Sequence, residues 1–197
     1  MSTDSISLYE THAHDFLQSR DSSRIGTGIV EAWARSVPRH CEVMEIACGG
    51  GRPVSLVLIN EGLKLWAIDS SQTLVTAFEE RFPDATVRCE SALDSDFFQK
   101  QFDAAISIGF IFLLSQEDQI KLLDQVARIL RPRASFLFTA PKEVGTWKDA
   151  LTGHSCVSLG RDVYEDALEQ SGFRLVAYHE DSGKNNYYEV EKVADGR

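Results

Sequence analysis

The chain has 197 residues, of which 43% are hydrophobic and 25% charged, a composition that predicts one globular domain and leaves no room for two. Thirty acidic residues against 20 Lys and Arg give a formal net charge of −10, which disfavours a nucleic-acid substrate because phosphate backbones repel an acidic protein. No apolar run approaches the roughly 20 residues of a membrane helix, and the N-terminus lacks the features of a secretory signal. We therefore expect a cytoplasmic protein that binds neither nucleic acid nor membrane.

The four cysteines, at positions 41, 48, 89 and 156, form no Cys-x-x-Cys pair, and no histidine lies at zinc-finger spacing from them. We expect these cysteines to be reduced and mostly buried, and we expect no metal site. Cys48 differs from the others only because it lies inside a glycine-rich turn.

Short apolar runs rich in β-branched and aromatic residues alternate with longer stretches of helical periodicity. This alternation predicts parallel β-α-β units in an open, Rossmann-like, doubly wound α/β sheet with helices on both faces. The predicted elements are helix 25–36, strand 41–47, helix 53–61, strand 63–69, helix 71–82, strand 86–89, strand 102–108, helix 116–130, strand 135–139, helix 162–171, and strands 173–178 and 187–193.

The last two predicted strands have only a polar turn between them, at 181–184. A turn this short leaves no room for a crossover helix, so the two strands must form an antiparallel hairpin at one edge. The five helix-connected strands and this hairpin together make a seven-stranded, mostly parallel sheet.

Two segments do not fit this alternation, residues 1–24 and residues 141–160. Structureless stretches of this length in a compact domain are usually binding lids or disordered segments. We expect both near the carboxyl edge of the sheet, where open α/β folds bind ligands. The domain organisation is therefore predicted as an N-terminal lid segment, 1–24, followed by a single domain, 25–197.

The run Ala47-Cys48-Gly49-Gly50-Gly51 lies between a predicted strand and a predicted helix. Glycine permits positive φ and lets a ligand approach the backbone closely, and the free amides of a helix start can bind an anion. The next strand ends in Asp69, twenty residues after Gly49, where a carboxylate can accept both ribose hydroxyls of a nucleoside cofactor. Together the turn and the acid predict a nucleoside-cofactor site.

The dinucleotide fingerprint needs a third glycine, and the corresponding position here is Val54 or Arg52, depending on where the count begins. The stretch from Glu45 to Gly51 instead resembles motif I of the class I S-adenosylmethionine (SAM)-dependent methyltransferases, acid-x-Gly-x-Gly-x-Gly. Ala47 replaces the first glycine of that motif, a change that is tolerable if this residue has negative φ.

The resemblance extends to other parts of the chain. Tyr9-Glu10-x-x-Ala13-x-x-Phe16 is similar to the lid helix of family members that act on small molecules, and Glu90-Ser91-Ala92 resembles the stretch that lines the adenine, with Glu90 or Ser91 as its contact. Ser107-Ile108-Gly109-Phe110 stands where the amino-methylating nucleic-acid and protein branches carry a proline-rich motif. The resemblance implies SAM as cofactor, with contacts at Tyr9, Glu45, Ala47, Gly49, Gly51, Asp69, Ser70, Glu90, Ser91, Ala92 and Ile108.

The family resemblance implies methyl transfer mainly by proximity and orientation, because the cofactor carries its own leaving group. No large inserted domain is present, so the acceptor pocket must come from residues 1–24 and 141–160, which favours a small-molecule acceptor. His154, beside Gly153, is the candidate general base. Two alternatives stay open at this stage: a SAM-binding protein without methyl transfer, and a nicotinamide-dependent oxidoreductase.

Overall fold

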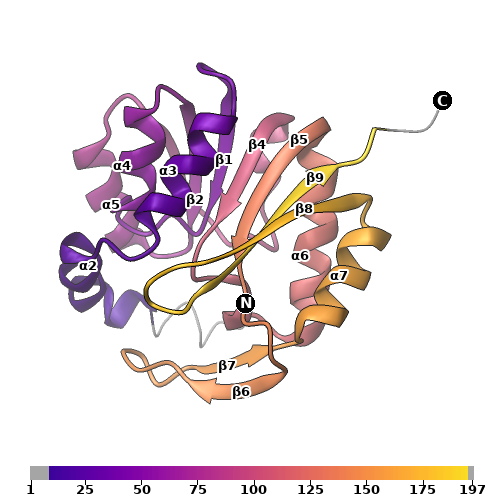
Figure 1. Ribbon diagram of the computed structural model, residues 1–197. Coiled ribbons are helices and arrows are strands. Elements are labelled where there is room, and N and C mark those ends of the chain that lie inside the picture. The colour runs from indigo at the N-terminus through magenta and orange to yellow at the C-terminus, as the bar shows by residue number, and fades with distance from the viewer. Residues whose placement is uncertain (1–8, 195–197) are drawn as a thin grey trace.

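The computed structural model describes residues 9–194 and has a central sheet with helices on both sides (Figure 1). The predicted seven-stranded sheet is confirmed, with strand order β3-β2-β1-β4-β5-β9-β8. The first five strands pair in parallel, whereas β9 is antiparallel to both β5 and β8. The strands are β1 Glu42–Ile46, β2 Lys64–Asp69, β3 Thr86–Cys89, β4 Phe102–Ser107, β5 Leu130–Thr139, β8 Phe173–Glu180 and β9 Asn186–Lys192.

The helices cover the two faces of the sheet and bury two separate apolar cores. Trp33, Leu58 and Phe78 come from helices on one face, and the other core contains Leu123 and Leu168 from helices on the opposite face. The helices are α2 Ala13–Ser22, α3 Thr27–Ser36, α4 Val54–Asn60, α5 Gln72–Arg81, α6 Gln116–Ile129 and α7 Arg161–Gln170, with short 3₁₀ turns η1 Phe97–Gln99 and η2 Ile111–Leu113. All the helices predicted from the sequence are present, with ends shifted by one or two residues.

The prediction of a long structureless loop over residues 141–160 was wrong. A two-stranded antiparallel sheet lies there, formed by β6 Gly145–Lys148 and β7 Ser155–Ser158. Each strand has only four residues and pairs only with the other, so its apolar pattern is too short to be recognised against a background of polar residues. Figure 1 shows this hairpin beside the end of the main sheet near which α2 also lies.

Strand order reverses between β1 and β4, because the chain moves outward from β1 to β3 and then returns to the other side. Open α/β sheets bind ligands at such a switch point, outside the carboxyl ends of the strands. The described part of the lid segment, residues 9–24, lies against this edge, whereas residues 1–8 of the predicted segment lie outside the described residues.

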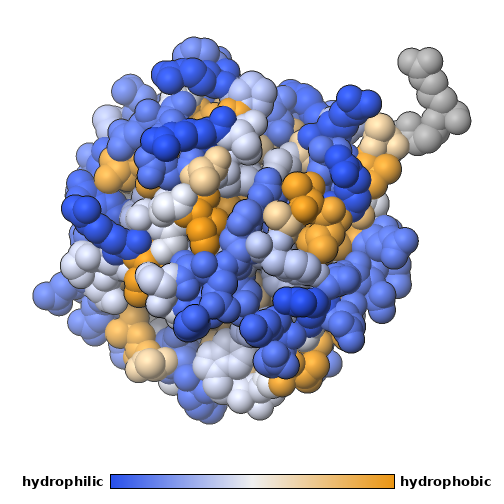
Figure 2. All heavy atoms as spheres, in the orientation of Figure 1, coloured by the Kyte–Doolittle hydropathy of each residue, from blue (hydrophilic) through white to orange (hydrophobic). Residues whose placement is uncertain are grey.

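The surface view in Figure 2 is mainly hydrophilic, with an apolar group over the β8–β9 hairpin. The exposed apolar side chains of this region are Leu175, Val176 and Val193. Within residues 9–194, no helix has both the length and the apolar character needed to cross a membrane.

Candidate active site

The turn after β1 reverses sharply because three of its residues have positive φ, Ala47 at 60°, Gly49 at 56° and Gly51 at 82°. The expectation of negative φ at Ala47 was wrong. The turn is closed by main-chain hydrogen bonds from the amide of Cys48 to the carbonyl of Ile68 and from the amide of Gly51 to Cys48, both 3.1 Å long. An alanine in the left-handed region costs about 1–2 kcal/mol, and this bonded turn holds Ala47 there.

Asp69, at the end of β2, connects the glycine turn to the start of α5. Its Oδ2 accepts the amide N–H of Gly49 at 2.8 Å, and its Oδ1 accepts that of Ser71 at 2.9 Å. Burial raises the pKa of the Asp69 carboxyl, and these amides act against that rise. Ser71, rather than Asp69, caps α5, because the Ser71 hydroxyl accepts the amide of Leu74. Each carboxylate oxygen of Asp69 keeps a second lone pair for a ligand.

A small hollow of about 10 Å³ opens beside Asp69 at the ends of β2, β3 and β4. Ser91, next to this hollow in the chain, has a buried hydroxyl without a hydrogen-bond partner among the described residues. A buried hydroxyl without a partner is costly, so this position suits a polar ligand atom. The residues lining the hollow are Ala47, Ile68, Asp69, Ser70, Glu90, Ala92 and Phe110.

A second cavity, of about 150 Å³, lies on the other side of Ala47. Glu45, the acid of the glycine motif, is buried at its base and accepts a hydrogen bond from the Ser55 hydroxyl at 2.6 Å. Burial raises the pKa of the Glu45 carboxyl to about 8, so this group is mostly protonated at neutral pH. The residues lining the cavity are Tyr9, Phe16, Arg20, Glu45, Ala47, Cys48, Arg52, Val54, Ile108, Gly109, Phe112 and Asp149.

Arg20 brings a positive charge from the last turn of α2 to this cavity. Its guanidinium makes no hydrogen bond or ion pair with any residue from 9 to 194, although its charge acts on Glu45 and on Asp181. Burial lowers the pKa of Arg20. A half-buried guanidinium without a partner next to a buried carboxyl suits a ligand that carries both a carboxylate and an ammonium group.

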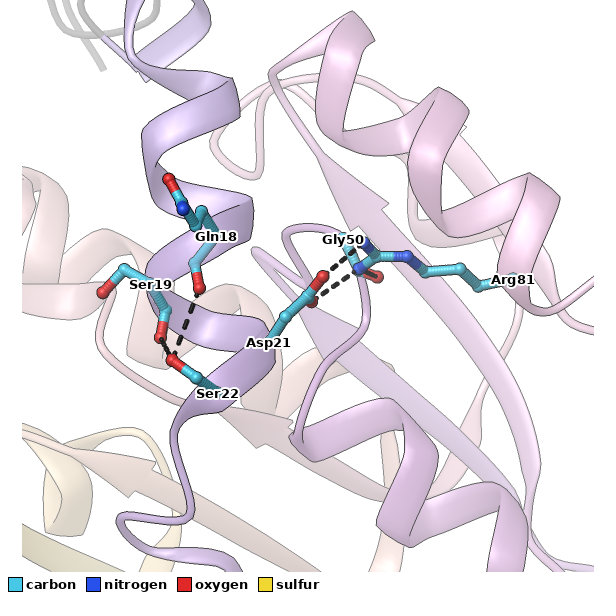
Figure 3. Close-up of polar contacts among 6 residues, drawn as sticks. All are labelled: Gln18, Ser19, Asp21, Ser22, Gly50 and Arg81. Atoms are coloured by element: carbon cyan, nitrogen blue, oxygen red, sulfur yellow. Dashed lines mark hydrogen bonds and ion pairs between the residues drawn. The ribbon is translucent and has the colours of Figure 1, made fainter.

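Helix α2 packs directly on the glycine turn. A Cβ placed on Gly49 would lie 2.9 Å from the Phe16 ring, and one on Gly50 would lie 2.2 Å from Leu17. Figure 3 shows the polar contacts at the end of α2, where Asp21 pairs with both terminal nitrogens of Arg81 at 3.0 and 2.7 Å. Arg81 also donates to the carbonyl of Gly50 at 2.9 Å, so one guanidinium links α2, α5 and the turn.

The start of the lid segment makes two further contacts. The Glu10 carboxylate accepts hydrogen bonds from the hydroxyls of Ser71 and Thr73, at the start of α5, and these bonds lower the pKa of Glu10. Tyr9 contacts the side chain of Thr152, in the turn of the β6–β7 hairpin, and burial raises the pKa of Tyr9. The lid segment therefore touches both α5 and the hairpin.

Comparison with known protein families identifies the family that has this arrangement of residues. Residues 43–133, which include the glycine turn, Asp69 and Glu90, match a family described as "Methyltransferase domain". Residues 43–133 form a class I SAM-dependent methyltransferase domain. This assignment identifies SAM, rather than a nicotinamide dinucleotide, as the cofactor.

Solved structures resemble the methyltransferase over most of its length. The 1,6-didemethyltoxoflavin-N1-methyltransferase from Burkholderia thailandensis has a TM-score of 0.77 at 13% identity, covering 96% of this chain and 87% of that one. A glycopeptide N-methyltransferase complexed with sinefungin gives 0.71 at 20% identity, covering 89% and 96%. The magnesium protoporphyrin IX methyltransferase from Synechocystis with bound SAM gives 0.68 at 16%, covering 84% and 77%. A search of curated proteins finds no match.

The residues of the methyltransferase fit SAM at both ends of the site. The Ser91 hydroxyl without a partner lies at the end expected for adenine, and the free guanidinium of Arg20 lies at the opposite end. Most of the expected contacts line one of the two hollows, and Ala47 lines both. Gly49, Gly51 and Ser91 line neither hollow, and a Cβ on Gly51 would meet the rings of Phe82 and Phe78.

His154 lies away from these two hollows. Its Nε2 is 3.0 Å from the carbonyl oxygen of Leu113, and the residue lines a separate, open cavity of about 700 Å³ that also includes Trp147 and Cys156. Its role as a base stays a prediction, and the structure places Asp149 of the same segment, rather than His154, at the cavity beside Glu45.

Sequence reasoning missed Arg20 and Asp149 as residues of the site. Arg20 follows Phe16 by four positions, so the two share one face of a helix, and this spacing was a usable signal. Asp149 had no such signal, because its place depends on the turn between β6 and β7. Within residues 9–194, no group of three or more His, Cys, Asp or Glu side chains is arranged to hold a metal ion.

Proposed function

We propose that this methyltransferase transfers the methyl group of SAM to a small-molecule acceptor. The observation that carries the proposal is the enclosure of the second cavity. Tyr9 and Phe16 of the lid segment, Phe112 of η2 and Asp149 of the hairpin turn surround about 150 Å³ beside Glu45. A side chain of a folded protein or a nucleic-acid base would need an open groove here, whereas a small molecule can be surrounded. The toxoflavin-precursor and protoporphyrin enzymes among the structural neighbours are described as acting on small molecules.

The cofactor is proposed to occupy both hollows. Asp69 would accept the ribose hydroxyls, and Ser70, Glu90, Ser91 and Ala92 would line the adenine. At the other end, Glu45 and Arg20 would hold the ammonium and carboxylate of the methionine part, near Tyr9 and Ile108. Ala47 and Gly49 would bring the backbone close to the cofactor between the two ends.

SAM supplies a methyl group on a sulfonium centre, which is already activated for displacement. The protein then contributes position and exclusion of water. Asp69 and Glu45, on adjacent strands β2 and β1, fix the two ends of the cofactor relative to the sheet. Tyr9 and Phe16 close the cavity from the lid side, and Phe112 supplies an apolar wall for the acceptor.

The described part of the lid segment, residues 9–24, is proposed to move during turnover. Binding pockets for molecules of drug size occupy about 300–1,000 Å³, whereas the two hollows measure about 150 and 10 Å³. The side chains of Phe16 and Leu17 pack on the glycine turn and must shift before SAM can bind.

Titration calorimetry with SAM, S-adenosylhomocysteine and NADH tests the cofactor assignment. We expect micromolar binding of the first two and none of NADH. A screen of small amines, phenols, thiols and carboxylates for release of S-adenosylhomocysteine tests the transfer. Tight NADH binding, or methylation of protein or nucleic acid in preference to every small molecule, would refute the proposal.

A further inference from the structure

We propose that Asp149 binds the acceptor and that the acceptor is an amine attached to a planar apolar group. This inference rests on the proposed function and adds a chemical class and a catalytic residue to it. Asp149 lies in the turn between β6 and β7 and lines the same cavity as Glu45 and Phe112.

The two oxygens of Asp149 have different surroundings. Oδ1 accepts hydrogen bonds from the amide of Thr152 at 2.8 Å, from the Thr152 hydroxyl at 2.7 Å and from the amide of Leu151 at 3.2 Å. Oδ2 makes no hydrogen bond with any residue from 9 to 194. The turn thus orients the carboxylate through one oxygen and leaves the other available to a ligand.

The charged side chains that line the cavity are the guanidinium groups of Arg20 and Arg52 and the carboxylate of Asp149, together with the buried carboxyl of Glu45. The charge of Arg20 acts on Glu45, whereas the charge of Asp149 acts on Tyr9. An acceptor that shares the cavity with the amino-acid part of SAM meets a carboxylate at the hairpin end, which favours a cationic or N–H-bearing group there. A carboxylate placed directly beside Asp149 would be repelled.

The wall beside Asp149 is aromatic. Phe112 lines the cavity and contacts Trp147 of β6, with ring centroids 5.4 Å apart. A planar apolar body can stack against such a wall, because offset aromatic contacts are favourable. Gly109 lines the same cavity and leaves open space there, since a Cβ on this residue would meet nothing within 4 Å.

The chemical step transfers the methyl group from sulfur to the amine nitrogen. A protonated amine gives one N–H proton to Asp149, which passes it to water, and the nitrogen lone pair forms the bond to the methyl carbon. The carbon–sulfur bond breaks, and its electron pair stays on sulfur. The products are S-adenosylhomocysteine, a methylated ammonium ion and one released proton. Asp149 stabilises the positive charge that develops on nitrogen as the bond to the methyl carbon forms.

The test compares Asp149→Asn with the wild type in complex with S-adenosylhomocysteine. Asparagine keeps the oxygen that accepts the three hydrogen bonds of the turn, so the fold should survive, whereas the free oxygen becomes an NH₂ donor. Glu143→Gln is the matched control, because it removes one charge from an exposed residue of the same segment. Benzylamine, benzyl alcohol and benzoate serve as probes of one size.

We expect the wild type and Glu143→Gln to bind benzylamine better than benzyl alcohol and benzoate. Asp149→Asn should weaken benzylamine binding about tenfold or more, because charge-assisted hydrogen bonds exceed neutral ones, and should leave affinity for S-adenosylhomocysteine within about twofold. The proposal fails if the wild type does not bind benzylamine, or if its preference survives in Asp149→Asn. Loss of cofactor binding by the wild type would instead refute the proposed function.

Discussion

The two ends of the site are held in different ways. At the end beside Asp69, backbone amides of Gly49 and Ser71 fix the carboxylate between a strand, a turn and a helix that follow one another in the chain. At the end beside Asp149, the walls come from the lid segment, η2 and the hairpin, which are distant in sequence and meet through side chains. The first end is a product of local structure and should be rigid, whereas the second depends on contacts that can open.

The largest effect should come from Asp69→Ala. The substitution leaves the buried amides of Gly49 and Ser71 without acceptors, at about 1–3 kcal/mol each, and it removes the proposed acceptor of the ribose hydroxyls. We expect a loss of about 2–6 kcal/mol in the free energy of unfolding and about 10- to 150-fold weaker SAM binding. Urea denaturation and calorimetry measure the two effects.

Asp84→Ala, which removes an exposed acid after α5, is the control and should change neither quantity. If Asp69→Ala lowers stability but leaves SAM affinity intact, the carboxylate is only a structural connector. That result would contradict the proposal that the cofactor binds beside Asp69.

The pH dependence of SAM binding should reveal the proton on the Glu45 carboxyl. Because the pKa of Glu45 is about 8, this carboxyl holds a proton in the ligand-free protein at neutral pH. An ammonium group that binds to the carboxylate would displace this proton. The affinity for SAM should therefore rise from pH 6 to pH 8, by at most about tenfold per pH unit. Glu45→Gln should abolish this rise. Calorimetry in buffers of different ionisation enthalpy measures the released proton, and an equal slope in both proteins would contradict the assignment.

The Glu45 carboxyl should also make the free energy of unfolding depend on pH. The native state keeps the Glu45 proton up to a pH of about 8, whereas the unfolded chain releases it near the ordinary pKa of 4.5. The contribution of this group is therefore fully present below the unfolded pKa and declines as pH rises toward 8, by at most about 1.4 kcal/mol per unit. Urea denaturation at pH 5, 6.5 and 8 should show this decline in the wild type and lose it in Glu45→Gln.

A smaller effect is expected from Asp21→Ala at the lid. The ion pair with Arg81 is partly exposed, so it should contribute about 0.5–1 kcal/mol to closure. Amide hydrogen exchange over residues 9–22 should become about two- to fivefold faster, and SAM should bind faster by a similar factor. Glu80→Ala, which removes an exposed acid of α5 next to Arg81 in the chain, is the control. Unchanged exchange would mean that Phe16 and Leu17 alone hold the lid.

The smallest effect should come from Ala47→Gly. Glycine relieves the cost of positive φ but loses more conformational entropy on folding, so the net gain should be at most about 1 kcal/mol. Urea denaturation measures it, and a loss of stability would show that the Ala47 methyl group contributes more through packing than its backbone conformation costs.

The difference between the two ends also explains what the sequence could predict. The seven-stranded sheet, the terminal hairpin, the glycine turn and the position of Asp69 follow from periodicity and from residues close together in the chain. The β6–β7 hairpin and the place of Asp149 could not be predicted, because four-residue strands that pair only with each other carry little pattern. His154 was favoured for its residue type and its glycine neighbour, and neither indicates which way a loop side chain points.

The packing of α2 on the glycine turn has an evolutionary consequence. Phe16 and Leu17 occupy the space that side chains at positions 49 and 50 would need. A mutation that adds a side chain to the turn is therefore tolerated only if the facing residue of the helix shifts or becomes smaller, and at position 49 it also strains a backbone with φ of 56°. Among descendants of this protein, positions 16 and 49, and likewise 17 and 50, should change as pairs, so the lid and the turn form one inherited unit.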